Sequence, residues 1–476
     1  MQRRTKIVAT IGPASAESTQ LRRLLEAGVD VCRLNCSHSG PEGLRRSIAR
    51  IRRVASELER PVGILLDLQG PKIRTGDVET PLELEDGGVL TLVMDSDFVG
   101  TGSRIGTTFP SLIGELSIGV KVLFADGTLS GEVSAIREDV VPGEVDITMH
   151  VGGALGSHKG INIPGIGLQT SSLTEKDRVD LEAGVAAGVD YVALSFVRSG
   201  EDIDELRAAL KAFDGESIPV CAKIEKPQAL ENIEEILERV DAIMVARGDL
   251  GVEIPLEQVP IAQKQLIHAA NRAGVLVITA TQMLDSMERN PRPTRAETTD
   301  VANAILDGTD AIMLSGETAV GRYPIRAVQV MDTIARQAEA SAFFVRPPLE
   351  DTPNFEGHGG ALSRAASFLV RENAFPVVVF TWSGSSAIVI SKSRPMGPVF
   401  ALTPHSTVYD ALSLVWGVTP IMVPTLSTTD ELVLTGERVL RDQGLVRPGQ
   451  EIVVLAGQTS TRGVTNLLKV EVVQDR

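Results

Sequence analysis

The stretch ILLDLQGPKIRTG, residues 64–76, joins a buried-looking apolar run to a charged segment. A continuous apolar run of this length is typical of a strand buried on both faces in a parallel sheet. The run stops at Asp67, and the chain then uses Pro71, Lys72 and Arg74 in quick succession. This pattern predicts a strand whose carboxyl end opens onto a polar site, and it raises the question of what Lys72 does there.

Seven other stretches have the same form as this strand. They are TKIVATIG (5–12), GVDVCRLN (28–35), GVDYVALS (188–195), PVCAKIEK (219–226), VDAIMVAR (240–247), VLVITATQ (275–282) and TDAIMLSG (309–316). Helical patterns lie between most of them, with an apolar stripe on one face and charge on the other. Eight such units predict an α/β fold of the (β/α)₈ TIM-barrel type.

The remaining segments predict two further domains. About a hundred residues separate the third run from the next helix, and their short alternating runs predict a small β-barrel inserted as a lid. Residues 344–360 are typical of a linker, and a second β/α pattern follows, which predicts an open C-terminal α/β domain. The predicted limits are 1–70 and 169–343 for the barrel, 71–168 for the lid and 344–476 for the C-terminal domain.

Composition excludes several classes of protein. The 476 residues carry 46 basic and 62 acidic side chains, a net charge of −16, so the chain is a poor candidate for binding nucleic acid. No apolar run approaches the ~20 residues that cross a membrane. The three cysteines, Cys32, Cys36 and Cys221, lack pairing or metal-site spacing, which favours a reducing cytoplasm. No GxxxxGK[ST] motif is present, so any nucleotide is bound without a P-loop.

Polar residues gather where the predicted strands end, which is where barrel enzymes place their chemistry. They are Arg33, Asn35, Ser37, His38, Asp67, Lys72, Arg74, Ser195, Lys223, Glu225, Arg247, Asp249, Thr281, Ser315 and Glu317. Any one of them could be a hydrogen-bonded group of the barrel mouth. The complete ring indicates an active site.

Two carboxylates in this ring suggest a metal. Glu225 and Asp249 come from neighbouring strands, and such oxygen ligands hold Mg²⁺ or Mn²⁺ while leaving positions for substrate. The alternative is that both form salt bridges with nearby basic residues. Lys223 and Arg33 supply fixed positive charge, which stabilisation of a transferring phosphoryl group or an enolate requires. The segment RGDLGVEIP (247–255) predicts a short helix that could receive a carboxylate or phosphate.

An ordered set of motifs now adds a resemblance. The chain resembles the pyruvate kinase family over essentially its whole length, through TKIVATIGPAS, RLNCSHS, LDLQGPKIRTG, INIPG, LTEKD, KIEKPQALENI, MVARGDLGVEIP, ATQMLDSM, PRPTRAE and DVANAILDGTDAIMLSGETAVGRYP. The resemblance implies a phosphotransferase of glycolysis that moves the phosphoryl group of phosphoenolpyruvate to ADP, giving ATP and pyruvate.

The resemblance also implies roles for individual residues. Glu225 and Asp249 would bind the divalent metal, Mg²⁺ or Mn²⁺. Lys223 would stabilise the phosphoryl group in flight and the enolate left behind. Arg33 would contact the same phosphoryl group, with Arg74 nearby.

The substrate carboxylate and the nucleotide take other positions in the family. The Gly248 and Asp249 amides would hold the carboxylate together with Thr281. Thr281 lies where the family delivers a proton to carbon. Asn35 and His38 would lie toward the nucleotide.

Lys72 occupies the position where many family members, which need K⁺, have glutamate. In those members K⁺ binds near the counterparts of Asn35, Ser37, Asp67 and the carbonyl of Leu68. A tethered ammonium at Lys72, balanced by Asp67, would replace the free cation, so we expect activity without K⁺. The alternative is an ordinary surface lysine on a hinge.

A phosphorylated effector has a possible site in TWSGSSA (381–387). Small hydroxyl side chains at a strand-to-helix turn suit a phosphate, and family members bind effectors in the matching loop. The residues concerned are Thr381, Ser383, Gly384, Ser385 and Ser386, with Arg462 as a second contact. Ordinary helix capping explains the same residues equally well. The resemblance further suggests a homotetramer.

Two other functions remain open from sequence. A metal-dependent aldolase or lyase of the same barrel type would also stabilise an enolate, but it would not explain Lys223 together with an inserted lid. A sugar-phosphate sensor with an inactive barrel would not need the intact ring of Arg33, Lys223, Glu225, Asp249 and Thr281.

Overall fold

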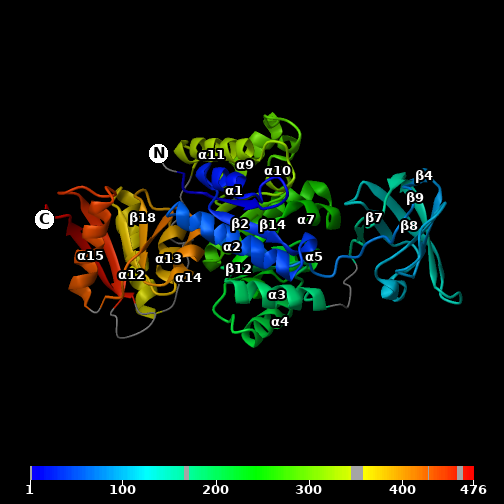
Figure 1. Ribbon diagram of the computed structural model, residues 1–476, viewed down its shortest axis with the longest axis horizontal. Coiled ribbons are helices and arrows are strands. Elements are labelled where there is room, and N and C mark those ends of the chain that lie inside the picture. Colours follow the sequence, from blue (N-terminus) through cyan, green and yellow to red (C-terminus); the bar gives the residue numbers. More distant parts are fainter. Residues whose placement is uncertain (1–2, 166–170, 345–356, 427, 458–464, 476) are drawn as a thin grey trace.

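The computed structural model describes residues 3–165, 171–344, 357–426, 428–457 and 465–475. Three folded parts lie in a row (Figure 1). A barrel surrounded by helices forms the centre, a strand-rich lid lies at one end, and the C-terminal α/β domain lies at the other.

The barrel is closed by eight parallel strands, which confirms the predicted fold. Their order around the barrel is β1-β16-β15-β14-β13-β12-β3-β2. Nearly every residue in them is buried, because helices cover the outside and side chains fill the inside. The strands are β1 (Lys6–Thr10), β2 (Val31–Asn35), β3 (Gly63–Asp67), β12 (Tyr191–Leu194), β13 (Val220–Ile224), β14 (Ala242–Ala246), β15 (Leu276–Ala280) and β16 (Ala311–Leu314).

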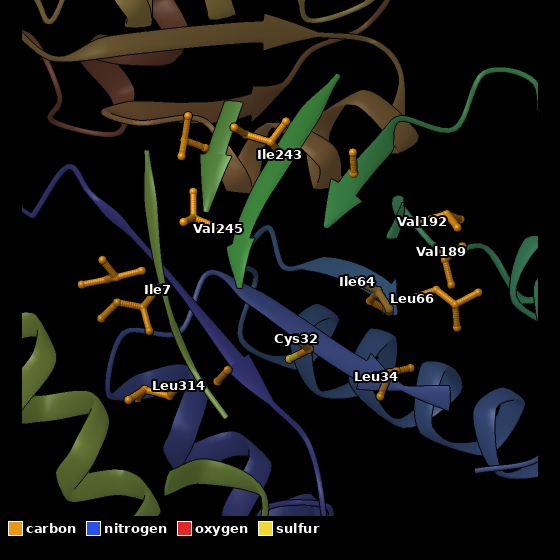
Figure 2. Close-up of a cluster of buried hydrophobic side chains, with 14 of the residues drawn as sticks. Ile7, Cys32, Leu34, Ile64, Leu66, Val189, Val192, Ile243, Val245 and Leu314 are labelled. Atoms are coloured by element: carbon orange, nitrogen blue, oxygen red, sulfur yellow. The ribbon is translucent and has the colours of Figure 1, made fainter. Parts of the chain in front are cut away.

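The outer helices pack on the barrel through their apolar faces. In α1 these are Leu21, Leu24 and Leu25, and the helix is followed by Gly28, whose φ of 120° suits glycine. Figure 2 shows the layer between strands and helices, with Ile7 among its side chains. The helices are α1 (Ser18–Glu26), α2 (Pro41–Glu57), α3 (Glu175–Ala187), α4 (Gly200–Ala212), α5 (Pro227–Glu231), α6 (Ile233–Leu237), α7 (Arg247–Glu253), α8 (Val259–Ala273), α9 (Arg295–Leu306), α10 (Gly316–Ala319) and α11 (Pro324–Ala340).

The lid leaves the barrel directly after β3, as expected from the long strand-like insertion. It consists of a six-stranded sheet, β11-β7-β8-β9-β5-β6, and a two-stranded sheet, β10-β4, around its own apolar core. The strands are β4 (Leu82–Leu84), β5 (Val89–Val93), β6 (Arg104–Gly106), β7 (Lys121–Phe124), β8 (Leu129–Arg137), β9 (Glu144–Val151), β10 (Gly153–Leu155) and β11 (Ile161–Asn162). The predicted limit at 168/169 lies outside the described residues.

The C-terminal domain has the mostly parallel sheet that its sequence predicts. The strand order is β19-β18-β17-β20-β21, and β21 alone runs antiparallel, at one edge. Its elements are α12 (Gly357–Glu372), β17 (Val377–Phe380), α13 (Ser385–Lys392), β18 (Val399–Thr403), α14 (Ser406–Ala411), β19 (Val418–Met422), α15 (Thr429–Asp442), β20 (Glu451–Gly457) and β21 (Thr465–Val472).

This domain closes the amino-terminal end of the barrel. A single apolar cluster runs from the barrel interior, with Leu65 and Met313, into the C-terminal domain, with Leu412 and Val415. The hydroxyl of Tyr191 in β12 also donates a hydrogen bond to the carbonyl of Ala411 at 2.9 Å. The open, polar end of the barrel therefore faces the lid.

A buried ionic cluster fixes the same junction. The ammonium of Lys392, at the end of α13, lies 2.6 Å from Asp310 Oδ2, and Arg394 Nη1 lies 2.8 Å from Asp310 Oδ1. The Arg394 guanidinium also lies 4.7 Å from the centre of the Trp416 ring. Burial raises the pKa of Asp310, but the Lys392 and Arg394 charges outweigh it and hold the pKa below the ordinary 3.8.

We predict that Asp310→Asn lowers the free energy of unfolding by about 3–5 kcal/mol at neutral pH, because it leaves two buried cations without their carboxylate. A depressed carboxyl pKa contributes stability above pH 3.8, which is lost as the pH falls through the lower folded pKa. Urea unfolding at neutral and acidic pH measures both effects. Asp139→Asn, at an exposed lid position, is the control. An equal loss at every pH would contradict this account.

Candidate active site

Four side chains meet at the lid-facing end of the barrel. Arg33 Nε lies 2.6 Å from Asp67 Oδ2, and the Lys223 ammonium lies 3.3 Å from Asp67 Oδ1 and 2.8 Å from Glu225 Oε1. Arg33, Asp67 and Lys223 lie on β2, β3 and β13, and Glu225 directly follows β13. These strands lie in one arc of the barrel, with β12 between β3 and β13. The predicted gathering of Arg33, Lys223 and Glu225 at strand ends is therefore observed.

The charges in this cluster support one another. Burial raises the pKa of Asp67, but the Arg33 and Lys223 charges outweigh it and lower that pKa overall. Burial lowers the pKa of Lys223, but Asp67 and Glu225 outweigh it and raise that pKa overall. Lys223 is consequently a permanent cation at neutral pH, held at a fixed position in a buried site.

Two hydroxyl residues complete the cluster: Ser195, which the sequence placed in the ring of polar strand ends, and Thr10, which it did not. Ser195 Oγ accepts a hydrogen bond from the Lys223 ammonium and donates one to the carbonyl of Leu68, both at 2.7 Å. Thr10 Oγ1 accepts from Arg33 Nη1 at 2.9 Å. Thr10 ends β1 and pairs in register with Arg33, so strand register is the signal that could have found it.

The two predicted metal ligands are neighbours in space. Burial raises the pKa of Glu225, and the nearby Asp249 carboxylate raises it further, against the Lys223 charge. A divalent cation between two such carboxylates removes their repulsion, and their hard oxygen donors suit Mg²⁺ or Mn²⁺. The described residues contain no group of three or more His, Cys, Asp and Glu side chains that could hold a metal. Glu225 and Asp249 thus fit a metal that completes its shell with substrate and water.

Glu225 is also fixed by the backbone. Its Oε2 accepts a hydrogen bond from the Phe196 N–H at 2.9 Å, and Phe196 has a φ of 58°. A non-glycine residue in this left-handed region is uncommon and marks a constrained loop. The orientation of Glu225 is therefore set from two sides, by Lys223 and by Phe196.

The start of α7 lies against Thr281. The Gly248 N–H donates to Thr281 Oγ1 at 2.7 Å, and Thr281 Oγ1 donates to the carbonyl of Ala280 at 2.6 Å. Thr281 has a φ of 66°, which is strained for a β-branched residue. Arg247, the first residue of α7, donates hydrogen bonds to Asp300 Oδ1 at 2.7 Å and to the Thr281 carbonyl at 2.8 Å. These bonds hold the start of α7 against the loop that carries Thr281.

Lys72 does not contact Asp67, contrary to the expected charge balance. The Asp67 oxygens already bind Arg33 and Lys223. The Lys72 ammonium lies 3.6 Å from Asp126 of the lid and 3.9 Å from Asp249 of α7. Its positive charge therefore lies between the lid and a predicted metal ligand.

The other predicted residues of the barrel mouth lie outside the central cluster. Asn35 Oδ1 accepts from the Ser37 N–H at 3.0 Å and caps the short 3-10 turn Cys36–His38, where the side chain of His38 is exposed. Arg74 lies on the crossing into the lid, and its guanidinium donates to the His158 carbonyl at 3.1 Å. The structure thus places Arg74 with the lid, apart from Arg33 and Lys223.

The predicted effector residues gather at the carboxyl end of β17. The Gly384 N–H donates to Thr381 Oγ1 at 2.9 Å, and Gly384 has a φ of 90°. Ser383 and Ser385 share a hydrogen bond of 3.0 Å, and Ser386 shares one of 2.7 Å with Thr465 of β21. Arg462 lies outside the described residues.

Comparisons with known proteins give one consistent result. The family model for the pyruvate kinase barrel domain matches residues 2–328, and that for the pyruvate kinase alpha/beta domain matches residues 361–471. The chain is 46% identical to a pyruvate kinase of Geobacillus stearothermophilus over 482 residues, covering 100% of this chain and 81% of the relative. It is 45% identical to pyruvate kinase 2 of Synechocystis, with 100% and 80% covered. A crystal structure of a pyruvate kinase from Cryptosporidium parvum superposes with a TM-score of 0.91 at 34% identity, covering 99% of this chain and 96% of that one.

Proposed function

Because the chain belongs to the pyruvate kinase family, we propose that the cluster of Arg33, Asp67, Lys223 and Glu225 is its centre of phosphoryl transfer. Membership makes the chain a phosphotransferase of glycolysis, with phosphoenolpyruvate, ADP, ATP and pyruvate as substrates and products. The proposal rests on one observation above all, the buried Lys223 ammonium held by Asp67, Glu225 and Ser195.

Lys223 and Arg33 supply the positive charge that the reaction needs. Phosphoryl transfer leaves little covalent chemistry to the protein, so positioning and electrostatic stabilisation account for most of the catalysis. Lys223 is fixed by three partners, which means that little reorganisation is needed when charge develops on the phosphoryl oxygens and on the enolate. Arg33 is fixed by Asp67 and Thr10 and contacts the same phosphoryl group.

Glu225 and Asp249 hold the divalent metal, Mg²⁺ or Mn²⁺. When bound, that ion supplies Lewis-acid charge toward the substrate oxygens. The support from this chain is a pair of neighbouring carboxylates, one of which is fixed by Lys223 and the Phe196 N–H.

The substrate carboxylate binds at the Gly248 and Asp249 amides, where it replaces Thr281 Oγ1 as the acceptor of the Gly248 N–H. Thr281 lies on the side from which carbon is protonated. Asn35 and His38 face the nucleotide.

The lid, residues 71–168, closes over the barrel of residues 1–70 and 169–343. On closure Arg74, which lies where the chain crosses into the lid, reaches the phosphoryl group. Lid closure excludes water from the transfer, as in other enzymes with hinged lids.

Lys72 takes the place of K⁺. Its ammonium lies near Asp249 and carries the single positive charge that a free monovalent ion would bring to this side of the site. The support is electrostatic: a fixed cation beside a predicted metal ligand offsets the negative charge that gathers there.

Regulation and assembly follow the family pattern in this proposal. A phosphorylated effector binds at Thr381, Ser383, Gly384, Ser385, Ser386 and Arg462, in the C-terminal domain of residues 344–476. A homotetramer is supported by exposed apolar side chains on the barrel, Leu256 and Ile261, and by the free edge of β21.

None of the described helices is long and apolar enough to cross a membrane. The three buried, unpaired cysteines support a cytoplasmic location.

We predict that Lys223→Met lowers kcat for pyruvate formation by about 10²- to 10³-fold, because it removes a preorganised charge. Binding of phosphoenolpyruvate, measured by equilibrium dialysis with Mg²⁺ present, should persist. Lys211→Met, at an exposed position in α4, serves as control. Full activity in the Lys223 variant would refute the assignment of this cluster.

We predict that the wild-type enzyme forms pyruvate equally well with and without K⁺ at matched ionic strength. Lys72→Glu should lose about 10- to 100-fold in activity without K⁺ and regain it when K⁺ is added, since the charge is then supplied from solution. Lys121→Glu makes the same charge change at an exposed lid position. A wild-type enzyme that requires K⁺ would return Lys72 to an ordinary hinge residue.

A further inference from the structure

The chain just after barrel strand β3 and the last lid strand, β11, both touch one small cluster, formed by Phe196, Lys226 and Glu253. We call it the hinge cluster. After β3, Gly70 has a φ of 68°, and a Cβ there would lie 2.7 Å from the Phe196 ring. In β11, Asn162 Nδ2 donates to Glu253 Oε1 at 3.0 Å. In Figure 1 the lid accordingly projects from the side of the barrel where α7 lies.

Glu253 is the centre of the hinge cluster. Its side chain is 2% exposed, and its Oε1 accepts from the Lys226 ammonium at 2.7 Å as well as from Asn162. Its Oε2 is buried and has no hydrogen-bond partner within the part of the chain that the structure describes. A buried ion pair contributes little net stability, and an unsatisfied buried oxygen lowers stability, so packing alone does not account for a carboxylate here.

Each member of the hinge cluster is connected to a proposed metal ligand by chain adjacency, a hydrogen bond or a shared helix. Lys226 follows Glu225 directly, and the Phe196 N–H donates to Glu225 Oε2. The Lys226 ammonium also lies 5.7 Å from the centre of the Phe196 ring. Glu253 ends the same short helix, α7, whose first turn holds Asp249.

The position of the lid is therefore linked to both proposed metal ligands through short chains of contacts. Asn162 is hydrogen-bonded to the last residue of α7, and Gly70 packs closely on the ring of Phe196, whose N–H donates to Glu225. A rotation of the lid that displaces Asn162 or Gly70 changes the contact with α7 or with Phe196, because Asn162 is hydrogen-bonded to Glu253 and a Cβ at Gly70 would lie 2.7 Å from the Phe196 ring.

We propose that Glu253 is a positioning residue that couples the orientation of the lid to the relative placement of Glu225 and Asp249. This inference rests on the proposed function, since it takes those two carboxylates as the metal ligands. In one orientation of the lid the hinge cluster holds the carboxylates at the separation that binds the metal, and loss of the Asn162 link relaxes that separation.

The test measures Mn²⁺ binding to the full-length protein in the presence of phosphoenolpyruvate, from the loss of the free Mn²⁺ signal in electron paramagnetic resonance. Asn162→Ala removes only the neutral contact from the lid, and Glu253→Gln removes the charge. We expect the Mn²⁺ Kd to rise at least about 5-fold in Asn162→Ala, in the range of coupled sites. We expect a rise of about 10- to 100-fold in Glu253→Gln, as for other residues behind metal ligands.

A second readout separates positioning from a loss of stability. Hydrogen exchange of the lid backbone should slow when Mn²⁺ and phosphoenolpyruvate bind to the wild type, and this slowing should be absent in Asn162→Ala although its Tm is unchanged. Ser134→Ala, which removes an exposed lid hydroxyl bonded to the Asp146 carbonyl, should behave as wild type.

Two failures are distinguishable. If the wild type shows metal binding that phosphoenolpyruvate enhances, but both variants have the same Mn²⁺ Kd and the same slowing of exchange, the coupling by Glu253 is refuted and the proposed function stands. If the wild type itself shows no such metal binding, the proposed function fails and the coupling fails with it.

Discussion

The Asp67 carboxylate is the constraint around which the rest of the active site is arranged. It is 1% exposed, and an isolated carboxylate at such a depth would take up a proton. Arg33 and Lys223 prevent this, and Asp67 in turn allows two cations to remain buried beside each other. The barrel makes the arrangement possible, because β2, β3, β12 and β13 are consecutive around the ring and present their carboxyl ends to one side.

The strand that carries Asp67 also leads into the lid, so the inserted domain is joined directly to a residue of the active site. From β3 the chain passes Gly70, packed on Phe196, and Lys72, placed between the lid residue Asp126 and the α7 residue Asp249. At the opposite end of the barrel the C-terminal domain closes the floor with apolar side chains and with the buried pair of Asp310 and Lys392. The barrel is thus closed at one end by the C-terminal domain, and its polar end faces the lid.

Much of this architecture could be predicted from the sequence. The eight strands are continuous apolar runs, the pattern of strands buried on both faces. The polar residues that follow these runs predicted Lys223, Glu225 and Asp249 at one face of the barrel. What could not be predicted is which charges pair. Lys72 lies against Asp126 and Asp249 because of how the lid sits on the barrel, and neither local pattern nor spacing encodes that contact. The partnership of Thr10 with Arg33 follows from strand register, and that of Lys392 with Asp310 from domain packing.

The central claim is that this arc of charges moves a phosphoryl group from an enol ester to a nucleoside diphosphate. Phosphorus-31 nuclear magnetic resonance follows that atom directly in a mixture of wild-type protein, phosphoenolpyruvate, ADP and Mg²⁺. The account predicts that the phosphoenolpyruvate signal falls in step with the growth of the ATP signals, mole for mole with pyruvate. Phosphorus that remains in phosphoenolpyruvate, or that appears as inorganic phosphate, would contradict it.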